Sequence, residues 1–229
     1  MQHEFPIWYL ENVDMFDFLC PGKMDASGLG GGHEPSYVFN KGDFIYFPDQ
    51  EAAEIYLLTS GRVKVGSYSE DGKEIIKAVL QPGELFGEMV MIGERVRKDF
   101  AVAMDDDVGI CSMSFRKMQR LLFENVDFSL KLSQAIGRKL VRMERRVESL
   151  VFKDARTRIV EFLRELALQK GDRQGDVVQV DHFFTHRDIA SLTATSRQTV
   201  TSVLNDLRSE GLIDFTRRSL YIPSMQKLA

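Results

Sequence analysis

The feature that most constrains the fold is a change of pattern at Phe115. Upstream, residues 38–114 hold short stretches rich in β-branched and aromatic residues (FIYF, EIIKAVL, VGICSM), separated by turn sequences such as NKGD and QPGE. Many short strands at intervals of about ten residues are typical of a β-sandwich or β-barrel. From Phe115 the apolar residues follow helical spacing instead. The sequence therefore predicts an α+β protein with an N-terminal antiparallel β-sandwich or barrel and helices after it.

One strand connection has a specific signature. The pair Asp71-Gly72 lies between two alternating stretches. A type I′ hairpin turn requires positive φ at both central residues, which an Asp-Gly pair tolerates. We therefore expect a hairpin with a type I′ turn at this position.

A coiled-coil seam follows in the helical part. Its apolar residues are spaced 4, 3, 4 and 3 apart, at Ile136, Leu140, Met143, Val147 and Leu150. A stripe this narrow either packs on the strand domain or pairs with its own copy. Charged residues flank it closely, as in RKLVRMERRVES. We therefore favour a homodimer with these five residues in its interface.

Two short helices are predicted further on. Thr185 is a plausible N-cap for a helix through Leu192, and residues 193–195 form a break. Ser196 then caps a second helix. Two short helices joined by a tight turn make a helix-turn-helix, whose second helix enters the DNA major groove.

The two faces of this second helix differ in chemistry. At about 100° per residue, its apolar residues fall on one side. The opposite side carries hydrogen-bonding residues: Arg197, Gln198, Thr201, Ser202, Asn205 and Arg208. Arg bonds bidentately to guanine and Gln to adenine. Hydroxyl groups at helix starts suit DNA phosphate contacts, which we expect from Thr185, Ser196 and Thr199.

The C-terminal sequence GLIDFTRRSLYI predicts two short strands around a basic turn, a wing in which Arg217 and Arg218 contact the DNA backbone. A winged helix that binds protein is the alternative. The charge distribution permits DNA binding, because residues 152–229 hold 12 Lys and Arg against 10 Asp and Glu although the whole chain has a net charge of −4. The hydrogen-bonding face also has no acidic residue before Asp206, which favours DNA.

Taken together, these motifs resemble the cyclic-AMP receptor/fumarate-nitrate regulator (CRP/FNR) family of bacterial transcription factors. The resemblance runs from about Val13 to Leu228. It includes the glycine-spaced roll motifs, the long helix and TSRQTV; the roll motifs are Lys41-Gly42-Asp43, Ser60-Gly61, Pro82-Gly83-Glu84 and Phe86-Gly87-Glu88. Each motif is weak alone, but their order and spacing make the resemblance specific.

The resemblance implies a homodimer that binds near-palindromic DNA and acts with RNA polymerase. It implies three parts: a β-roll effector domain at 1–126, a dimerisation helix at 127–152 and a winged helix-turn-helix at 153–229. The family's three base-reading positions fall on Arg197, Gln198 and Ser202. The family usually has Glu at the second position and often Arg at the third, so its usual half-site need not apply here. An Arg-Gln pair favours adjacent G and A.

The resemblance leaves the effector open. The cyclic-AMP branch binds the nucleotide phosphate with an Arg-Ser pair, and an ungapped count from Gly87-Glu88 places Lys98 and Asp99 there. A carboxylate at 99 repels a phosphodiester in a part-buried pocket, although Arg97 takes the Arg role after a shift of one residue. Cyclic nucleotide is therefore disfavoured, and Glu88 as a mere turn residue of the roll stays an alternative. The candidate contacts for an unidentified effector are Gly87, Glu88, Arg97, Lys98 and Met143.

Other sensing and catalytic chemistries find no support. An iron–sulfur sensor needs about four cysteines, and the chain has Cys20 and Cys111, which we expect to be reduced thiols in a cytoplasmic protein. The four histidines lie outside the predicted roll strands, so we expect no haem, no metal site and no roll enzyme. No apolar run is long enough to span a membrane. A cyclic-nucleotide-binding module that does not act on DNA is the alternative function.

Overall fold

The computed structural model describes residues 19, 36–181, 184–216 and 219–228. These residues divide into two compact units. The first contains residues 19, 36–73 and 77–141, and the second contains residues 74–76 and the chain from 142 onward. The border at 141/142 lies inside one continuous helix. The three-part division at 126/127 and 152/153 stays a prediction.

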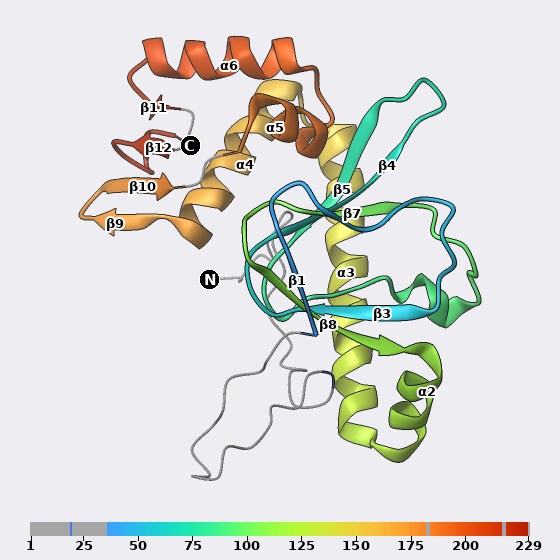
Figure 1. The fold of residues 1–229 in the computed structure, drawn as a ribbon. Coiled ribbons are helices and arrows are strands. Elements are labelled where there is room, and N and C mark those ends of the chain that lie inside the picture. Colours follow the sequence, from blue (N-terminus) through green and yellow to red (C-terminus); the bar gives the residue numbers. More distant parts are fainter. Residues whose placement is uncertain (1–18, 20–35, 182–183, 217–218, 229) are drawn as a thin grey trace. The chain divides into compact units, whose positions relative to one another are not determined.

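The first half of the chain forms two four-stranded antiparallel sheets (Figure 1). One sheet has the order β1-β8-β3-β6 and the other β2-β7-β4-β5. The strands are β1 (Tyr37–Phe39), β2 (Phe44–Tyr46), β3 (Glu54–Leu58), β4 (Val63–Tyr68), β5 (Glu74–Leu80), β6 (Leu85–Phe86), β7 (Phe100–Ala103) and β8 (Val108–Ser114). The predicted β-roll is therefore confirmed.

The sheet that contains β3 and β8 separates two hydrophobic cores. Alternate side chains of a strand point to opposite faces, so Leu58 and Ile110 face the roll interior whereas Leu57 faces the helices. The core that Leu57 faces also contains Met118 of α2 (Phe115–Glu124) and Phe128 of α3 (Val126–Phe152). The roll interior is thus lined by side chains from both sheets, and α2 and α3 close one outer face.

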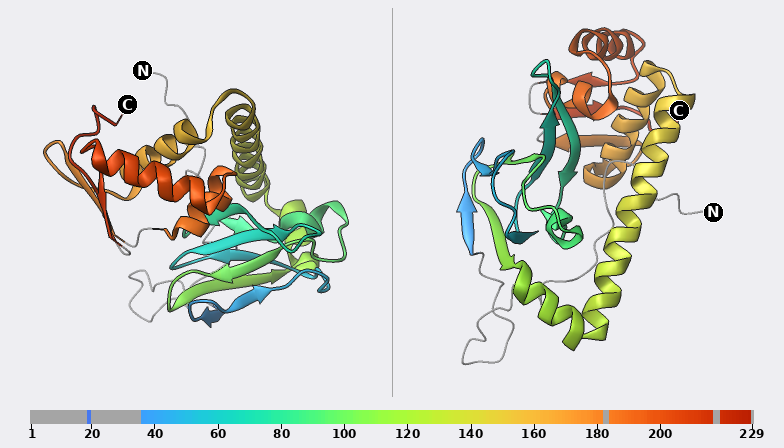
Figure 2. Two further views of the ribbon diagram at one scale, coloured as in Figure 1. Left: turned by 90° about the horizontal axis from the view of Figure 1, so that it is seen from above. Right: turned by 90° about the vertical axis from the view of Figure 1, so that its right-hand side faces the viewer.

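The predicted helical pattern is confirmed from Phe115 onward. Ser114 caps α2 by accepting a hydrogen bond from the Lys117 amide, and the Asn125 side chain accepts one from the Phe128 amide at 2.9 Å. Asn125 thereby ends one helix and starts the next, and Figure 2 shows the chain turning there between α2 and α3. A short 3₁₀ helix, η1 (Glu88–Ile92), follows β6.

Two sequence-based details need correction. The Asp71-Gly72 hairpin joins β4 and β5, but positive φ occurs at Gly72 and not at Asp71. The Gly72 amide donates to the Ser69 carbonyl, so a single left-handed glycine closes the turn and type I′ was wrong. Cys111 was expected to be a reduced thiol, yet it is buried and disulfide-bonded. The other cysteine, Cys20, lies outside the described residues.

The second unit contains α4 (Ala155–Lys170), α5 (His186–Thr193) and α6 (Arg197–Ser209), which pack on one another (Figures 1 and 2). Phe162 of α4 is fully buried and meets Phe184 edge to face. A four-stranded antiparallel sheet in the order β11-β12-β10-β9 completes the unit. Its strands are β9 (Asp172–Gln174), β10 (Val177–Asp181), β11 (Asp214–Phe215) and β12 (Ser219–Ile222). The expected pair of helices followed by two short strands is confirmed.

The turn between α5 and α6 begins one residue later than predicted, because Thr193 still belongs to α5. The amides of Ala194 and Thr195 both donate to the Ala190 carbonyl, which is a common helix ending. Arg158 of α4 donates to the Thr193 and Ala194 carbonyls at 2.9 and 3.2 Å. The turn is therefore fixed by its own amides and by a guanidinium from α4.

This turn contains a strained residue. Ala194 has a φ of 49°, a left-handed conformation that costs an L-residue about 1–2 kcal/mol. Replacing Ala194 with Gly removes that strain, partly offset by the greater freedom of glycine in the unfolded chain. We expect A194G to stabilise the second unit by about 0.5–1 kcal/mol and to raise the Tm measured by circular dichroism. Ala190→Gly, inside α5, should lower the Tm instead; a lower Tm for A194G would contradict this account.

Candidate nucleic-acid interface and sensor cluster

Helix α6 presents one buried face and one exposed face. Its buried residues are Val200, Val203, Leu204 and Leu207. Arg197, Gln198 and Ser202 lie on the opposite side, and all three are exposed. The helix is therefore held by an apolar stripe while its hydrogen-bonding side chains face solvent. This is the arrangement that a helix needs in order to enter a DNA groove while packed on its own domain.

The predicted phosphate contacts are engaged as helix caps. The Thr185 hydroxyl accepts from the Asp188 amide, and the Asp188 carboxylate accepts from the Thr185 amide and hydroxyl. The Ser196 hydroxyl accepts from the Thr199 amide at 3.0 Å, and the two hydroxyls lie 2.8 Å apart. These caps satisfy the amides at the starts of α5 and α6. Thr185 and Ser196 are also exposed.

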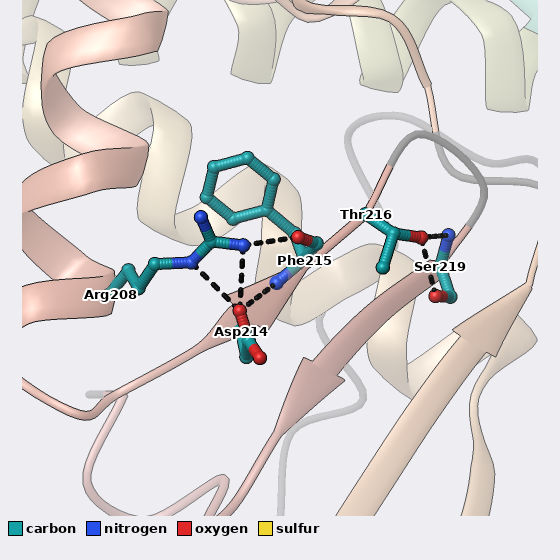
Figure 3. A network of polar contacts seen from close by, with 5 residues as sticks. All are labelled: Arg208, Asp214, Phe215, Thr216 and Ser219. Atoms are coloured by element: carbon teal, nitrogen blue, oxygen red, sulfur yellow. Dashed lines mark hydrogen bonds and ion pairs between the residues drawn. The ribbon is translucent and has the colours of Figure 1, made fainter.

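The helical wheel placed Arg208 among the exposed hydrogen-bonding residues, but the structure joins it to the wing (Figure 3). Its guanidinium donates to the Asp214 carboxylate at 2.7 Å and to the Phe215 carbonyl, and it lies 4.0 Å from the centre of the Phe215 ring. The Phe215 amide and the Arg208 side chain both hold the pKa of Asp214 below its ordinary value. In the turn that follows, Thr216 and Ser219 hydrogen-bond to each other. Arg208 therefore fixes β11 against α6.

Arg217 and Arg218, the predicted backbone contacts of the wing, lie outside the described residues. The strands on either side of them pair in antiparallel register, with Phe215 opposite Leu220. The expected hairpin is thus present around the basic turn.

A second group of polar side chains lies inside the roll. Arg97 is 4% exposed and donates to the Gly87 carbonyl at 2.8 Å and to the Glu54 carbonyl. Its guanidinium lies 4.5 Å from the centre of the Tyr46 ring and 5.4 Å from that of Tyr56. Of the predicted effector contacts, the structure therefore brings Arg97 and Gly87 into direct contact.

Glu88, the next residue, pairs with the long helix. The Lys139 ammonium on α3 lies 2.8 Å from a Glu88 carboxylate oxygen and also donates to the Leu85 carbonyl at 2.7 Å. Both side chains are mostly buried. Sequence analysis did not identify Lys139, although its position beside the predicted seam was a usable signal. This ion pair joins the candidate effector site to α3.

Asp99 and Lys98 point in different directions. Asp99 is partly buried with Lys77 at 4.0 Å, and burial together with the nearby Glu88 carboxylate raises the pKa of Asp99. Lys98 is exposed and pairs with Glu94 at 2.6 Å. The structure therefore does not bring Lys98 together with Gly87, Glu88 and Arg97. Burial and the Asp99 charge also raise the pKa of Tyr46.

The predicted seam residues all lie on α3 and all are exposed, between 43% and 61%. They are Ile136, Leu140, Met143, Val147 and Leu150. Within the described part of the chain, no three His, Cys, Asp or Glu side chains lie close enough to hold a metal ion. Over the same residues, no helix is long and apolar enough to cross a membrane.

Comparisons with known proteins agree with this architecture. Residues 37–125 match the family model of the cyclic nucleotide-binding domain, and residues 157–229 match that of the Crp-like helix-turn-helix domain. The chain is 30% identical over 205 residues to the cyclic AMP receptor protein of Thermus thermophilus, covering 89% of each chain. It is 29% identical over 197 residues to the global nitrogen regulator of Synechococcus elongatus, covering 85% of this chain and 89% of that one.

Among solved structures, the fold is similar to a CooA variant from Carboxydothermus hydrogenoformans, with 31% identity, a TM-score of 0.70 and 84% of each chain covered. The helix-turn-helix match rules against a nucleotide-binding module that does not act on DNA. The chain belongs to the CRP/FNR family of effector-controlled, DNA-binding transcription regulators.

Proposed function

We propose that this protein binds near-palindromic DNA as a homodimer, with α6 of each protomer in the major groove. The observation that carries the proposal is the exposed, hydrogen-bonding face of α6 opposite a fully apolar buried face. Arg197 and Gln198 read adjacent bases, with Ser202 one helical turn further on. The phosphate contacts come from the hydroxyls of Ser196, Thr199 and Thr185, whose capping hydrogen bonds rearrange or are shared when DNA binds. The wing contacts the DNA backbone through Arg217 and Arg218.

The homodimer is supported by the seam on α3. Five apolar side chains at coiled-coil spacing stay exposed in the single chain, and exposed apolar side chains in a continuous stripe mark an association surface. A symmetric pair of α3 helices buries them and presents two copies of α6 to two half-sites. We propose RNA polymerase as a further partner and the cytoplasm as the location of the protein.

Control by an effector is supported by the polar cluster in the roll. Glu88 is paired with Lys139, so a ligand that competes for Glu88 changes how α3 is held. Such a change, together with repacking of the seam near Met143, alters the arrangement of the two recognition helices. A cyclic nucleotide is disfavoured as this ligand, because Lys98 points to solvent and Asp99 adds a second carboxylate near Glu88.

Selection of bound sequences from random duplexes tests the proposal directly. The purified full chain is incubated with the pool at physiological salt, first alone and then with cyclic AMP or cell extract. Recovery of a palindrome with half-sites about 10 bp apart, centre to centre, supports a dimeric reader. Weak, sequence-blind and salt-sensitive binding under all three conditions would contradict it.

Replacing Arg197 with Ala should relax specificity at one base pair in each half-site. A bidentate contact to guanine contributes about 1–3 kcal/mol of discrimination, so binding to the selected site weakens while binding to the site mutated at that base pair changes little. Titration of fluorescent duplexes measures both affinities. Arg173→Ala removes the same charge from β9 and should preserve the specificity. Unchanged discrimination in R197A would count against base reading by Arg197.

Replacing Met143 with Lys should dissociate the dimer. The substitution places two ammonium groups in an apolar seam, where unpaired charges are costly to bury. Light scattering coupled to size exclusion gives the mass in solution. Glu148→Gln changes the net charge by the same amount at an exposed position of α3 outside the seam, and it should leave the dimer intact. A stable dimer of M143K would show that the seam is misassigned.

A further inference from the structure

His186 lies where three elements of the second unit meet. It is the first residue of α5, its Nδ1 atom lies 2.9 Å from the Thr201 hydroxyl of α6, and its ring meets Phe215 of β11 edge to face at 5.7 Å. Thr201 follows Arg197 by one helical turn on the exposed face of α6. The imidazole is therefore packed against the ridge of side chains that we propose reads DNA.

The hydrogen bonds around Thr201 determine which nitrogen of His186 carries the proton. The Thr201 hydroxyl donates to the Arg197 carbonyl at 2.9 Å. A hydroxyl has one hydrogen, so the contact with His186 must be an N–H donated from Nδ1. In the neutral ring, Nε2 then carries a lone pair and no hydrogen. Protonation adds an N–H at Nε2 and a positive charge without disturbing the bond to Thr201.

We propose that His186 is a DNA-backbone contact that acts in its protonated form, with Nε2–H donating to a phosphate oxygen while Nδ1–H holds Thr201. This inference rests on the DNA binding proposed above and adds proton uptake to it. Each protomer takes up as much as one proton, at its His186, when it binds.

The charged groups around His186 set the direction of this effect. Burial, and then the positive charge of Arg197 on α6, lower the pKa of His186 below its ordinary value. Asp214 on β11 is paired with Arg208 of α6, and Asp188 on α5 itself is engaged by the Thr185 cap. None of these carboxylates is bonded to the imidazole within the described residues, so the free protein holds His186 mainly neutral near pH 7.

A bound phosphate reverses this balance, because a nearby negative charge favours the imidazolium and raises the pKa of His186 in the complex. Protons are then taken up on binding at pH values between the free and the bound pKa. Within that window affinity rises as pH falls, by at most about tenfold per pH unit for each His186 that binds a proton. Above the bound pKa the affinity no longer depends on pH.

The test is a titration of the full chain on its selected duplex at about pH 8 and about pH 6, at constant ionic strength. Wild type should bind at least about threefold more tightly at the lower pH. His186→Asn keeps an N–H near the Nδ1 position but cannot titrate, so its affinity should be the same at both pH values. His182→Asn removes another histidine of the same chain and should keep the wild-type pH dependence.

The salt dependence provides a readout that a merely structural role would not change. At about pH 6, His186→Asn should lose one phosphate contact per half-site. Its slope of log affinity against log salt should therefore be smaller than that of the wild type by about 1 for each half-site. His186→Arg, permanently charged, should bind tightly at both pH values. The inference would be overturned if His186→Asn kept the pH dependence of the wild type, or if the affinity of the wild type did not change with pH. Failure of the proposed function is distinguishable, because it removes sequence preference at about pH 8, where His186 is neutral.

Discussion

The recognition half of this protein depends on one guanidinium. Arg158, near the start of α4, donates to the Lys153 carbonyl at 2.7 Å as well as to the Thr193 and Ala194 carbonyls of the α5–α6 turn. Charge-assisted hydrogen bonds are the strong ones, and these three connect the segment after α3 with the turn that sets the angle of α6. The side chains that we propose read DNA are therefore positioned by Arg158 of α4 together with the buried apolar face of α6.

The charged side chains inside the roll are also held by contacts within the protein. The two terminal nitrogens of Arg97 donate to backbone carbonyls and its guanidinium lies over aromatic rings, whereas its buried Nε has no hydrogen-bond partner among the described residues; Glu88 pairs with Lys139. A buried charge is tolerated when it is paired and hydrogen-bonded. A ligand that enters this cluster must therefore replace interactions that already exist, and one of them belongs to α3. The proposed effector site and the long helix thus share the Glu88–Lys139 ion pair.

Sequence patterns predicted the elements well because each depends on neighbouring residues. The caps Thr185 and Ser196 and the start of α2 at Phe115 were correct for that reason. Features that depend on tertiary contacts were missed. Whether Arg97 or Lys98 turns inward is decided by the pairing of this segment with the turn between β2 and β3, where the Arg97 amide donates to the Gln50 carbonyl. The attachment of Arg208 to the wing and of His186 to Thr201 likewise joins residues that no local pattern relates.

The alternation along β3 and β8 has a consequence for how such a chain can vary. Because Leu57 and Leu58 face different cores, inserting or deleting one residue in β3 would rotate every later side chain of that strand to the other face. Apolar groups that now meet α2 and α3 would point at Arg97 and its aromatic neighbours. Insertions or deletions in these two strands are therefore tolerated only two residues at a time, and those of a single residue only in turns such as residues 69–73. Sister proteins should differ in length at their turns and keep the span of β3 and β8 constant.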